Sequence, residues 1–488
     1  MRKSIYVILV IVFCTLPLMA QGTFVYTNND RIPNSVSAFS AAANGVLSPV
    51  PGSPFATGGN GAGGGFFASN RITTAIMKNV LYVANAGSNN VSAFSIDPVT
   101  GVLTPVPGSP FATGGVADGI GTSLTATPDN KFLIAANGAS MTITVFSVAA
   151  NGALSQVAGS PFASGASGGL ASAKVTSDGK FLAVSSAPGN IFMFTISAAG
   201  ALVPVPGSPT ADTGAAGIDC NCAGTQLYVA LNGTNTKVDV FDIGLSGALS
   251  RISGSPFMGP GVNSNVSVLS PDDSKLFVSD QSSTTITVFS VAPNGSLTVV
   301  PGSPFAVVGA LFPSGMATNQ GGSLLYTASF NNVIGGFSIA GNGGLTAIPG
   351  SPFSNGFAGG FGLLSLAVFP AKNCCPPPVI SNASATPNVL SVPNHKFVDV
   401  IVNYTVTDPC PNTCVLTVSS NEPINGVGDG NTSPDWQVID PHHVLLRAER
   451  AGNGSGRIYT IKITCTNETN QESSTKTLMV LVPHDERH

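Results

Sequence analysis

The sequence predicts an all-β protein: a seven-bladed β-propeller with velcro closure, followed by a small Ig-like β-sandwich. Three observations support this prediction: a repeated tetrapeptide, four strand-like runs in each repeat, and a change in composition near residue 373. The tetrapeptide Gly-Ser-Pro-Phe begins at positions 52, 108, 159, 254, 302 and 350, and the variant Gly-Ser-Pro-Thr begins at 207. Self-similarity with a period of about 20–50 residues is typical of folds built from one repeated supersecondary unit.

Each repeat has the order of runs expected of a propeller blade. In the second repeat, segments 81–85, 91–96 and 102–106 are strand-like runs, and the third of them leads into the tetrapeptide. A fourth run, 123–127, ends in the turn Pro128-Asp129-Asn130-Lys131, which has the residue types that hairpin turns favour. Four strands in a repeat of about 48 residues indicate one blade.

The ends of the repeat region predict how the ring closes. Segment 24–28 matches the second strand of a blade, and the missing first strand is found at 363–369. We expect these two segments to pair, because closure removes the exposed sheet edges that promote aggregation. The predicted propeller then spans residues 21–373.

Residues 1–20 have the pattern of a secretory signal peptide. Arg2 and Lys3 precede an apolar stretch, and a small-residue cleavage site ends at Ala20. The stretch is short for a membrane span, and a retained anchor is the alternative. We therefore expect a secreted or cell-surface protein with no membrane span after cleavage. The net charge of −4, without a stripe of Lys and Arg, argues against nucleic acid as a partner.

Short tyrosine-containing segments in the repeats point to a known family. Segments 26–29, 82–85 and 228–232 read Tyr-Thr-Asn-Asn, Tyr-Val-Ala-Asn and Tyr-Val-Ala-Leu-Asn, and they resemble Tyr-Val-Thr-Asn (YVTN) repeats. With its Asp-containing turns, the region 23–373 resembles the lactonase-type seven-bladed propellers, the family of bacterial 6-phosphogluconolactonase and of the muconate-lactonising cyclase. The resemblance implies an active site of His, Glu and Arg side chains at one mouth of the ring. Residues 21–373 contain neither His nor Glu, so no catalytic residue of the family can be transferred to this sequence.

These observations favour an exported, non-catalytic binding or surface-scaffold module. Its predicted partner is a polar ligand, a glycan or a protein at the propeller face, because Asn-, Ser- and Gly-rich loops suit adaptable hydrogen bonding. Arg71, Asp118 and Asp280 are the binding candidates at the predicted propeller mouth. No cofactor is expected in the propeller.

The alternative is a lactonase-like hydrolase with an atypical Asp/Arg site at the propeller mouth. Lactone hydrolysis needs a base to activate water and donors for the developing oxyanion. Asp and Arg side chains that converge within hydrogen-bonding reach would favour this alternative. The candidate bases are Asp118, Asp212 and Asp280, and the candidate guanidinium groups are Arg31, Arg71 and Arg251.

Composition changes after Lys372, where a second domain is predicted. Residues 374–380 form a Cys- and Pro-rich linker, which is stiff. Alternating strands between 398 and 482 predict a sandwich over residues 381–488 that resembles the Ig-like modules of bacterial surface proteins.

The cysteines and an Asp/Asn-rich segment give further predictions. In an exported chain we expect a Cys414–Cys465 disulfide across the sandwich, and Cys410 joined to Cys374 or Cys375. Cys220 and Cys222 are expected to be small buried residues rather than a metal-binding pair. Asp429, Asn431 and Asp435 offer oxygen ligands at alternating spacing for Ca²⁺, with an Asx-rich turn as the alternative.

Overall fold

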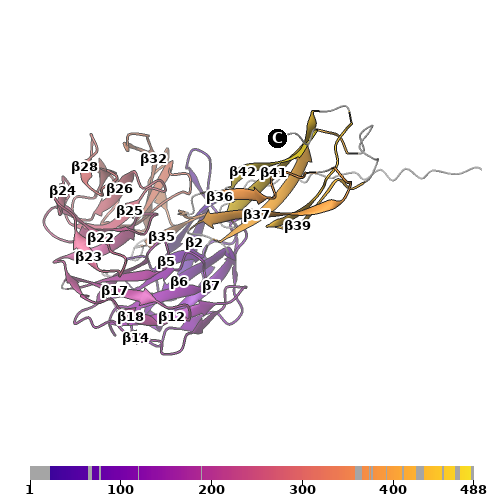
Figure 1. Cartoon of the computed structure of the whole chain (residues 1–488). Coiled ribbons are helices and arrows are strands. Elements are labelled where there is room, and N and C mark those ends of the chain that lie inside the picture. The colour runs from indigo at the N-terminus through magenta and orange to yellow at the C-terminus, as the bar shows by residue number, and fades with distance from the viewer. Residues whose placement is uncertain are drawn as a thin grey trace, which may run out of the picture.

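The computed structural model describes residues 22–63, 69–75, 78–118, 120–187, 189–357, 365–372, 374, 377–391, 393–408, 411–424, 433–452, 455–467 and 473–484. The predicted signal peptide lies outside these residues. The described residues contain seven five-stranded sheets, followed by a four-stranded and a three-stranded sheet. Figure 1 shows the C-terminal strands, in orange and yellow, extending away from the rest of the molecule.

The seven five-stranded sheets are the blades. Blade 1 consists of β35 (Ser365–Phe369), β1 (Thr23–Asn28), β2 (Ser35–Ala41), β3 (Leu47–Pro49) and β4 (Phe55–Ala56). Blade 2 consists of β5 (Ile72–Ala75), β6 (Val80–Asn85), β7 (Asn90–Ile96), β8 (Leu103–Pro105) and β9 (Phe111–Ala112), with the 3-10 helix η2 (Ala86–Ser88) between β6 and β7. Blade 3 consists of β10 (Thr122–Ala126), β11 (Phe132–Asn137), β12 (Thr142–Val148), β13 (Leu154–Gln156) and β14 (Phe162–Ala163). Blade 4 consists of β15 (Leu170–Val175), β16 (Phe181–Ser186), β17 (Asn190–Ile196), β18 (Leu202–Pro204) and β19 (Thr210–Ala211).

The remaining three blades follow the same order. Blade 5 consists of β20 (Ala215–Cys220), β21 (Gln226–Leu231), β22 (Thr236–Ile243), β23 (Leu249–Arg251) and β24 (Phe257–Gly259). Blade 6 consists of β25 (Ser264–Leu269), β26 (Lys275–Asp280), β27 (Thr285–Val291), β28 (Leu297–Val299) and β29 (Phe305–Ala306). Blade 7 consists of β30 (Pro313–Thr318), β31 (Leu324–Ser329), β32 (Val333–Ile339), β33 (Leu345–Ala347) and β34 (Phe353–Ser354).

The blades form a closed ring around their first strands. Each first strand contacts the first strand of the next blade, in the cycle β5, β10, β15, β20, β25, β30, β35 and back to β5. In blade 1, β35 pairs antiparallel with β1, so that Phe369 lies opposite Phe24 and Ser365 opposite Asn28. The predicted seven-bladed propeller and its velcro closure are therefore confirmed, with residues 363 and 364 of the predicted closing strand outside the described residues.

The repeated tetrapeptide divides the outer strand of each blade into two short pieces. In blade 2, both β8 and β9 pair with β7, and Gly108 lies between them with a φ of 88° that glycine adopts readily. The hydroxyl of Ser109 accepts a hydrogen bond from the backbone N–H of Ala93 at 2.9 Å, at the point where the outer strand leaves β7. The serine thus satisfies a ladder donor that the interrupted strand would leave unpaired. Equivalent bonds are made by Ser53, Ser160, Ser208, Ser255, Ser303 and Ser351.

The tyrosines of two of the three YVTN-like segments join neighbouring blades. The hydroxyl of Tyr82 in blade 2 donates to the carbonyl oxygen of Gly152 in blade 3 at 2.9 Å. Tyr26 bonds in the same way to Gly101 of the next blade. Because both rings are buried, the repeat motif stabilises the blade-to-blade interface.

The two ends of the ring differ in the segments that they display. One end carries the connections from blade to blade, such as 57–63, and the loops from the second to the third strand of a blade, such as 29–34. We call this end the connection face. The turn face is the opposite end, with the first-to-second strand turns such as 127–131 and 221–225.

The C-terminal β-domain consists of two sheets that share one apolar core. One sheet has the order β36 (Val379–Thr386), β37 (Phe397–Thr407), β40 (His443–Arg447), β39 (Trp436–Asp440), and the other β38 (Asn412–Ser420), β41 (Gly456–Asn467), β42 (Ser473–Pro483). Buried Val400 and Leu446 of the first sheet belong to the same core cluster as Ile461 and Val480 of the second. A two-sheet β-domain is thus confirmed, whereas its assignment as Ig-like stays a prediction.

The disulfides confirm one predicted pairing and correct another. Cys414 bonds to Cys465 as predicted, but the two residues lie opposite each other on adjacent strands β38 and β41 with their Cα atoms 4.0 Å apart. The bond therefore joins strands of one sheet rather than crossing the sandwich.

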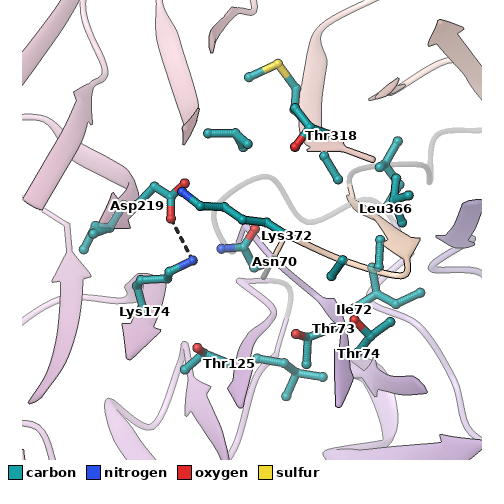
Figure 2. Close-up of a pocket in the computed structure, with 18 of the residues that line it drawn as sticks. Asn70, Ile72, Thr73, Thr74, Thr125, Lys174, Asp219, Thr318, Leu366 and Lys372 are labelled. Atoms are coloured by element: carbon teal, nitrogen blue, oxygen red, sulfur yellow. Dashed lines mark ion pairs between the residues drawn. The ribbon is translucent and has the colours of Figure 1, made fainter. Parts of the chain in front are cut away.

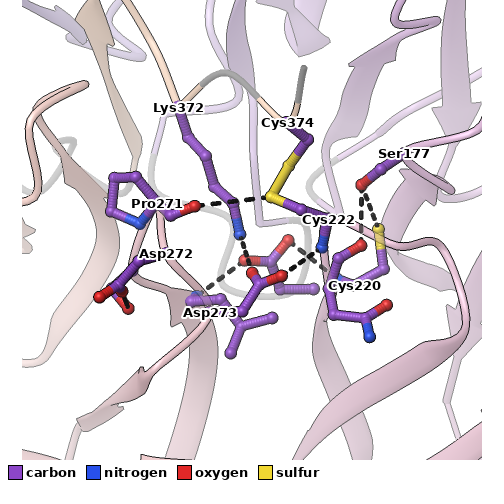
Figure 3. A network of polar contacts seen from close by, with 12 residues as sticks. Ser177, Cys220, Cys222, Pro271, Asp272, Asp273, Lys372 and Cys374 are labelled. Atoms are coloured by element: carbon purple, nitrogen blue, oxygen red, sulfur yellow. Dashed lines mark hydrogen bonds and ion pairs between the residues drawn. A yellow bond between two sulfur atoms is a disulfide. The ribbon is translucent and has the colours of Figure 1, made fainter. Parts of the chain in front are cut away.

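The predicted partner of Cys374 was wrong. Cys374 bonds to Cys222, a residue 152 positions earlier at the turn face of blade 5, so Cys222 is not a simple buried thiol (Figure 3). Cys220 is buried and reduced, as expected. Cys375 and Cys410 lie outside the described residues.

Candidate functional site

A candidate pocket lies in the central channel and is lined by the first strands of all seven blades (Figure 2). Its volume is about 160 Å³, and most of its lining side chains are aliphatic or threonine. Three charged residues extend into it: Lys174 from β15, Asp219 from β20, and Lys372 from the segment after β35. We call this the channel pocket.

The charges of the channel pocket are neutralised within the protein. Lys174 Nζ lies 2.7 Å from Asp219 Oδ1, and the backbone N–H of Leu269 donates to Asp219 Oδ2 at 2.8 Å. Burial acts to raise the pKa of Asp219, but the charges of Lys174 and Lys372 outweigh it and hold that pKa below its usual range. A carboxylate with these partners is a poor proton acceptor, so this cluster is better suited to a structural role.

The segment that follows β35 crosses the turn-face end of the channel and is fixed there. Lys372 Nζ lies 2.8 Å from Asp273 Oδ1 in a turn of blade 6, and the other oxygen of Asp273 accepts a hydrogen bond from the backbone N–H of Cys222 at 2.5 Å (Figure 3). The Cys222–Cys374 disulfide closes the same network. We call the described residues 370–372 and Cys374 the strap. Because the strap occupies the turn face, the connection face is the better place for a ligand.

A second pocket of about 680 Å³ lies at the connection face of blade 1. Asp30, Arg31 and Asn34, which follow β1, line it together with Ile32 and with Phe357 from the connection between blades 7 and 1. We call it the mouth pocket. It combines one carboxylate and one guanidinium group in the same lining.

Asp30 is the buried carboxylate of the mouth pocket. It forms an ion pair with Arg71, and both side chains are 1% exposed. Its other oxygen, Oδ1, accepts a hydrogen bond from the backbone N–H of Ala62 at 2.8 Å. Burial raises the pKa of Asp30 although Arg71 and the Ala62 hydrogen bond act to lower it. A raised pKa makes this carboxylate a stronger base than an ordinary aspartate.

The glycine-rich segment after the first tetrapeptide holds Asp30 in place. The backbone N–H of Gly61 donates to the carbonyl oxygen of Arg31 at 2.7 Å, and that of Gly63 to the carbonyl oxygen of Asp30 at 3.1 Å. A Cβ atom at Gly61 would lie 2.1 Å from the carbonyl carbon of Asp30, so only glycine fits there. The described part of this segment therefore packs tightly against the mouth pocket.

Arg31 provides the accessible positive charge of the mouth pocket. It is half-buried, and its guanidinium carbon lies 4.4 Å from the centre of the Phe357 ring. Stacking on an aromatic ring orients a guanidinium group.

The three binding candidates from the sequence have separate environments. Arg71 is buried behind Asp30 and supports it, whereas Asp118 is exposed on the connection between blades 2 and 3. Asp280 is fully buried at the end of β26, where the hydroxyls of Thr285 and Thr287 donate to it at 3.0 and 2.6 Å. Asp280 therefore occupies the place that Asn85 has in blade 2, and its role there is structural.

A second convergence of Asp and Arg lies between blades 4 and 5. Arg251 Nη2 is 3.1 Å from Asp212 Oδ1 and 2.8 Å from Asp239 Oδ2, and both carboxyl groups are buried. Burial, followed by the neighbouring Asp239, raises the pKa of Asp212 to about 8. In the junction of blades 1 and 2 the corresponding residues are Thr57 and Ser92, where the Ser92 hydroxyl donates to the Thr57 carbonyl oxygen. The junction of blades 4 and 5 thus has a charged cluster where the junction of blades 1 and 2 has a neutral hydrogen bond.

The predicted Ca²⁺ site is described only at Asp435. This residue is buried and its Oδ2 is 2.7 Å from Arg457 Nη1, so one of its oxygens is already used. Asp429 and Asn431 lie outside the described residues, and in the described part of the chain no three His, Cys, Asp or Glu side chains gather as metal ligands.

Arg71 and Arg31 are among the residues predicted from the sequence, whereas Asp30 is not. Residues 28–31 read Asn-Asn-Asp-Arg and begin at the last residue of β1, where the next repeat has Asn-Ala-Gly-Ser. A charged pair at the start of a connection-face loop was the available signal.

Comparison with known proteins agrees with the fold. Residues 68–167 match the family model described as lactonase, 7-bladed β-propeller. A solved candidate 6-phosphogluconolactonase from Bacteroides fragilis is similar at 20% identity with a TM-score of 0.57, over 72% of this chain and 99% of that one. The periplasmic gluconolactonase of Pseudomonas aeruginosa is similar at 20% identity with a TM-score of 0.54, over 68% of this chain and 98% of that one. No curated protein sequence matches significantly.

The chain is thus a seven-bladed propeller followed by a β-domain, and the resemblance of its propeller to the lactonase-type propellers, seen in the sequence, is confirmed. At this level of identity the solved structures support the fold alone. Within the described residues, no helix has the length and apolar character required to cross a bilayer.

Proposed function

We propose that this protein is an exported lactonase-type propeller that hydrolyses a lactone in the mouth pocket. The observation that carries the proposal is the convergence of Asp30, Arg31 and Arg71 at the connection face, where Asp30 and Arg31 line one pocket. The match to the lactonase family model also supports a lactonase-like hydrolase over a non-catalytic scaffold.

The roles follow from the environment of each side chain. The Asp30 carboxylate accepts a proton from a water molecule, whose oxygen attacks the lactone carbonyl carbon. The Arg31 guanidinium stabilises the negative charge that forms on the carbonyl oxygen. The ring C–O bond then breaks, and the proton passes from Asp30 to the leaving oxygen. Arg71 acts on Asp30 from behind and is a positioning residue.

A non-catalytic ligand-binding module is the second candidate function. One specific observation favours it, namely that residues 21–373 contain neither His nor Glu, the side chains that the family resemblance implies for catalysis. In that case the mouth pocket binds a polar ligand without turnover.

Lactone hydrolysis by the full-length protein and its variants separates the two functions. In a pH-stat assay with a panel of simple and sugar lactones, Asp30→Asn should lower kcat by about 10²–10⁴-fold. Arg31→Ala should lower kcat/KM by about 10²–10³-fold, because it removes an oxyanion donor. Asp118→Asn, an exposed aspartate on the same face, is the matched control and should retain activity.

Circular dichroism and thermal unfolding of each variant establish that the propeller is folded. Turnover by the wild type that Asp30→Asn leaves intact would rule out the proposed site. Absence of turnover on every lactone, with ligand binding that Arg31→Ala abolishes, would favour the non-catalytic module.

A further inference from the structure

The lining of the mouth pocket is divided between polar and apolar groups. The polar part is Asp30, Arg31 and Asn34, all in the loop after β1. The apolar part includes the Ile32 side chain and the Phe357 ring, against which Arg31 stacks. The other lining residues are Pro33, Ser35, Pro54, Ala56 and Gly63. The lining is therefore amphipathic, with the charged pair beside a surface of carbon atoms.

This lining does not suit a phosphorylated sugar. A phosphate dianion is typically bound by several cationic or backbone donors, and Arg31 is the sole cation among the described lining residues. A sugar ring also presents hydroxyl groups on most of its carbon atoms, which would lose water without gaining hydrogen bonds against Ile32 and Phe357.

The apolar character continues outside the pocket on the connection face. Ile32 is 70% exposed although it is a large aliphatic side chain. Other exposed apolar residues lie in the connections between blades on the same face: Val116, Val262, Val308, Leu311 and Phe312. These five residues belong to the connections between blades 2 and 3, 5 and 6, and 6 and 7, so the apolar surface at the mouth pocket itself is that of Ile32 and Phe357. An exposed aliphatic side chain at the edge of a pocket is typical of a ligand-binding surface.

We propose that the mouth pocket takes lactones that carry an apolar alkyl or acyl tail. The lactone ring is placed at Asp30 and Arg31, and the tail lies over Ile32 and Phe357. The inference rests on the proposed hydrolysis for the fate of the ring and adds the chemical class of the substrate. Because of the hydrophobic effect, the preference for a tailed lactone over the same lactone without a tail should increase with each tail carbon that is removed from water.

A series of lactones that differ in the tail tests the inference. With the full-length protein, kcat/KM should be at least tenfold higher for δ-decalactone than for δ-valerolactone, which has the same ring without the tail. Glucono-δ-lactone and its 6-phosphate should be poorer than δ-decalactone. Ile32→Asp should reduce the ratio of the two kcat/KM values at least fivefold, because it places a charge where the tail lies.

Leu245→Ser is the matched control, since Leu245 is a fully exposed aliphatic residue in a blade 5 hairpin on the turn face. It should leave the ratio unchanged. Binding of δ-decalactone is measured in parallel by isothermal titration with wild type and Ile32→Asp.

The outcomes distinguish this inference from the proposed function. Turnover with equal rates on both δ-lactones, or with a preference for the sugar lactones, overturns the inference and leaves hydrolysis standing. Absence of turnover, together with δ-decalactone binding that Ile32→Asp weakens, supports the ligand class and rejects hydrolysis. Absence of both turnover and binding overturns both.

Discussion

At the scale of single residues, one junction between blades has two carboxylates where another has neutral side chains. This difference makes the stability of the protein depend on pH. Thr57 and Ser92 join blades 1 and 2, whereas Asp212 and Asp239 lie at the corresponding places between blades 4 and 5, around Arg251. Burial and Asp239 raise the pKa of Asp212 to about 8. The folded protein therefore keeps a proton between about pH 4 and pH 8 that the unfolded chain releases.

This proton makes the free energy of unfolding fall as pH rises from 5 to 8, by at most about 1.4 kcal/mol per pH unit. Asp212→Asn carries no titrating proton, so we expect it to remove this slope and to be more stable than wild type at pH 8. Denaturant unfolding at a series of pH values measures both effects.

Asp97→Asn is a suitable control for the pH series, because backbone hydrogen bonds lower the pKa of Asp97 and any effect lies below pH 4. Equal slopes for wild type and Asp212→Asn between pH 5 and 8 would contradict the assignment of this proton to Asp212.

At the scale of elements, repetition determined what the sequence could predict. The serine of each tetrapeptide accepts the same backbone hydrogen bond in its blade, for example Ser109 from Ala93. Tyr26 and Tyr82 both donate to a glycine carbonyl oxygen of the next blade. Such local, recurring contacts leave a pattern, and the pattern predicted the strands, their order and the ring closure.

Contacts that occur once leave no such pattern. Asp30 and Arg71 are 41 residues apart, and Cys222 and Cys374 are 152 residues apart. Each pair depends on how the blades are placed in space, which is why Asp30 was missed and the partner of Cys374 was wrong. The channel charges Lys174 and Asp219 were missed for the same reason, since they come from different blades.

The tetrapeptide itself can be tested in one blade. The Ser160 hydroxyl accepts a hydrogen bond from the backbone N–H of Val145, a fully buried residue of β12. Ser160→Ala leaves this buried donor without its acceptor, so we expect the free energy of unfolding to fall by about 1–3 kcal/mol. Denaturant titration of the propeller transition measures the loss.

Two further variants separate the hydrogen bond from other effects of the substitution. Ser160→Thr keeps a hydroxyl and should recover much of the stability. Ser155→Ala, at an exposed position on the outer strand of the same blade, should stay within about 0.5 kcal/mol of wild type. A loss of equal size in Ser155→Ala and Ser160→Ala would show that the hydroxyl acceptor has no special role.

At the scale of the whole molecule, the strap closes the ring a second time. The β1–β35 pairing joins the first and last strands of the propeller, and the Cys222–Cys374 bond then ties the chain after β35 to the turn face of blade 5. Lys372 adds an ion pair to Asp273 of blade 6. Separation of β35 from β1 therefore requires either opening of this disulfide or movement of blades 5 and 6.

The disulfide should consequently stabilise the propeller as a ring rather than one blade. Replacing both residues, Cys222→Ala with Cys374→Ala, should lower the free energy of unfolding of the propeller by about 2–4 kcal/mol, because the bond closes a loop of 152 residues. Reduction of the wild type should reproduce this loss. The Cys414→Ala, Cys465→Ala pair is the control, since that bond lies within the C-terminal β-domain and its removal should leave the propeller transition in place.

Hydrogen exchange adds a spatial readout: without the strap, the amides of β1 and β35 should exchange faster, while those of β10 and β11 on the far side of the ring keep their protection. Uniform loss of protection in all blades would instead mean that the disulfide acts on the unfolded chain alone.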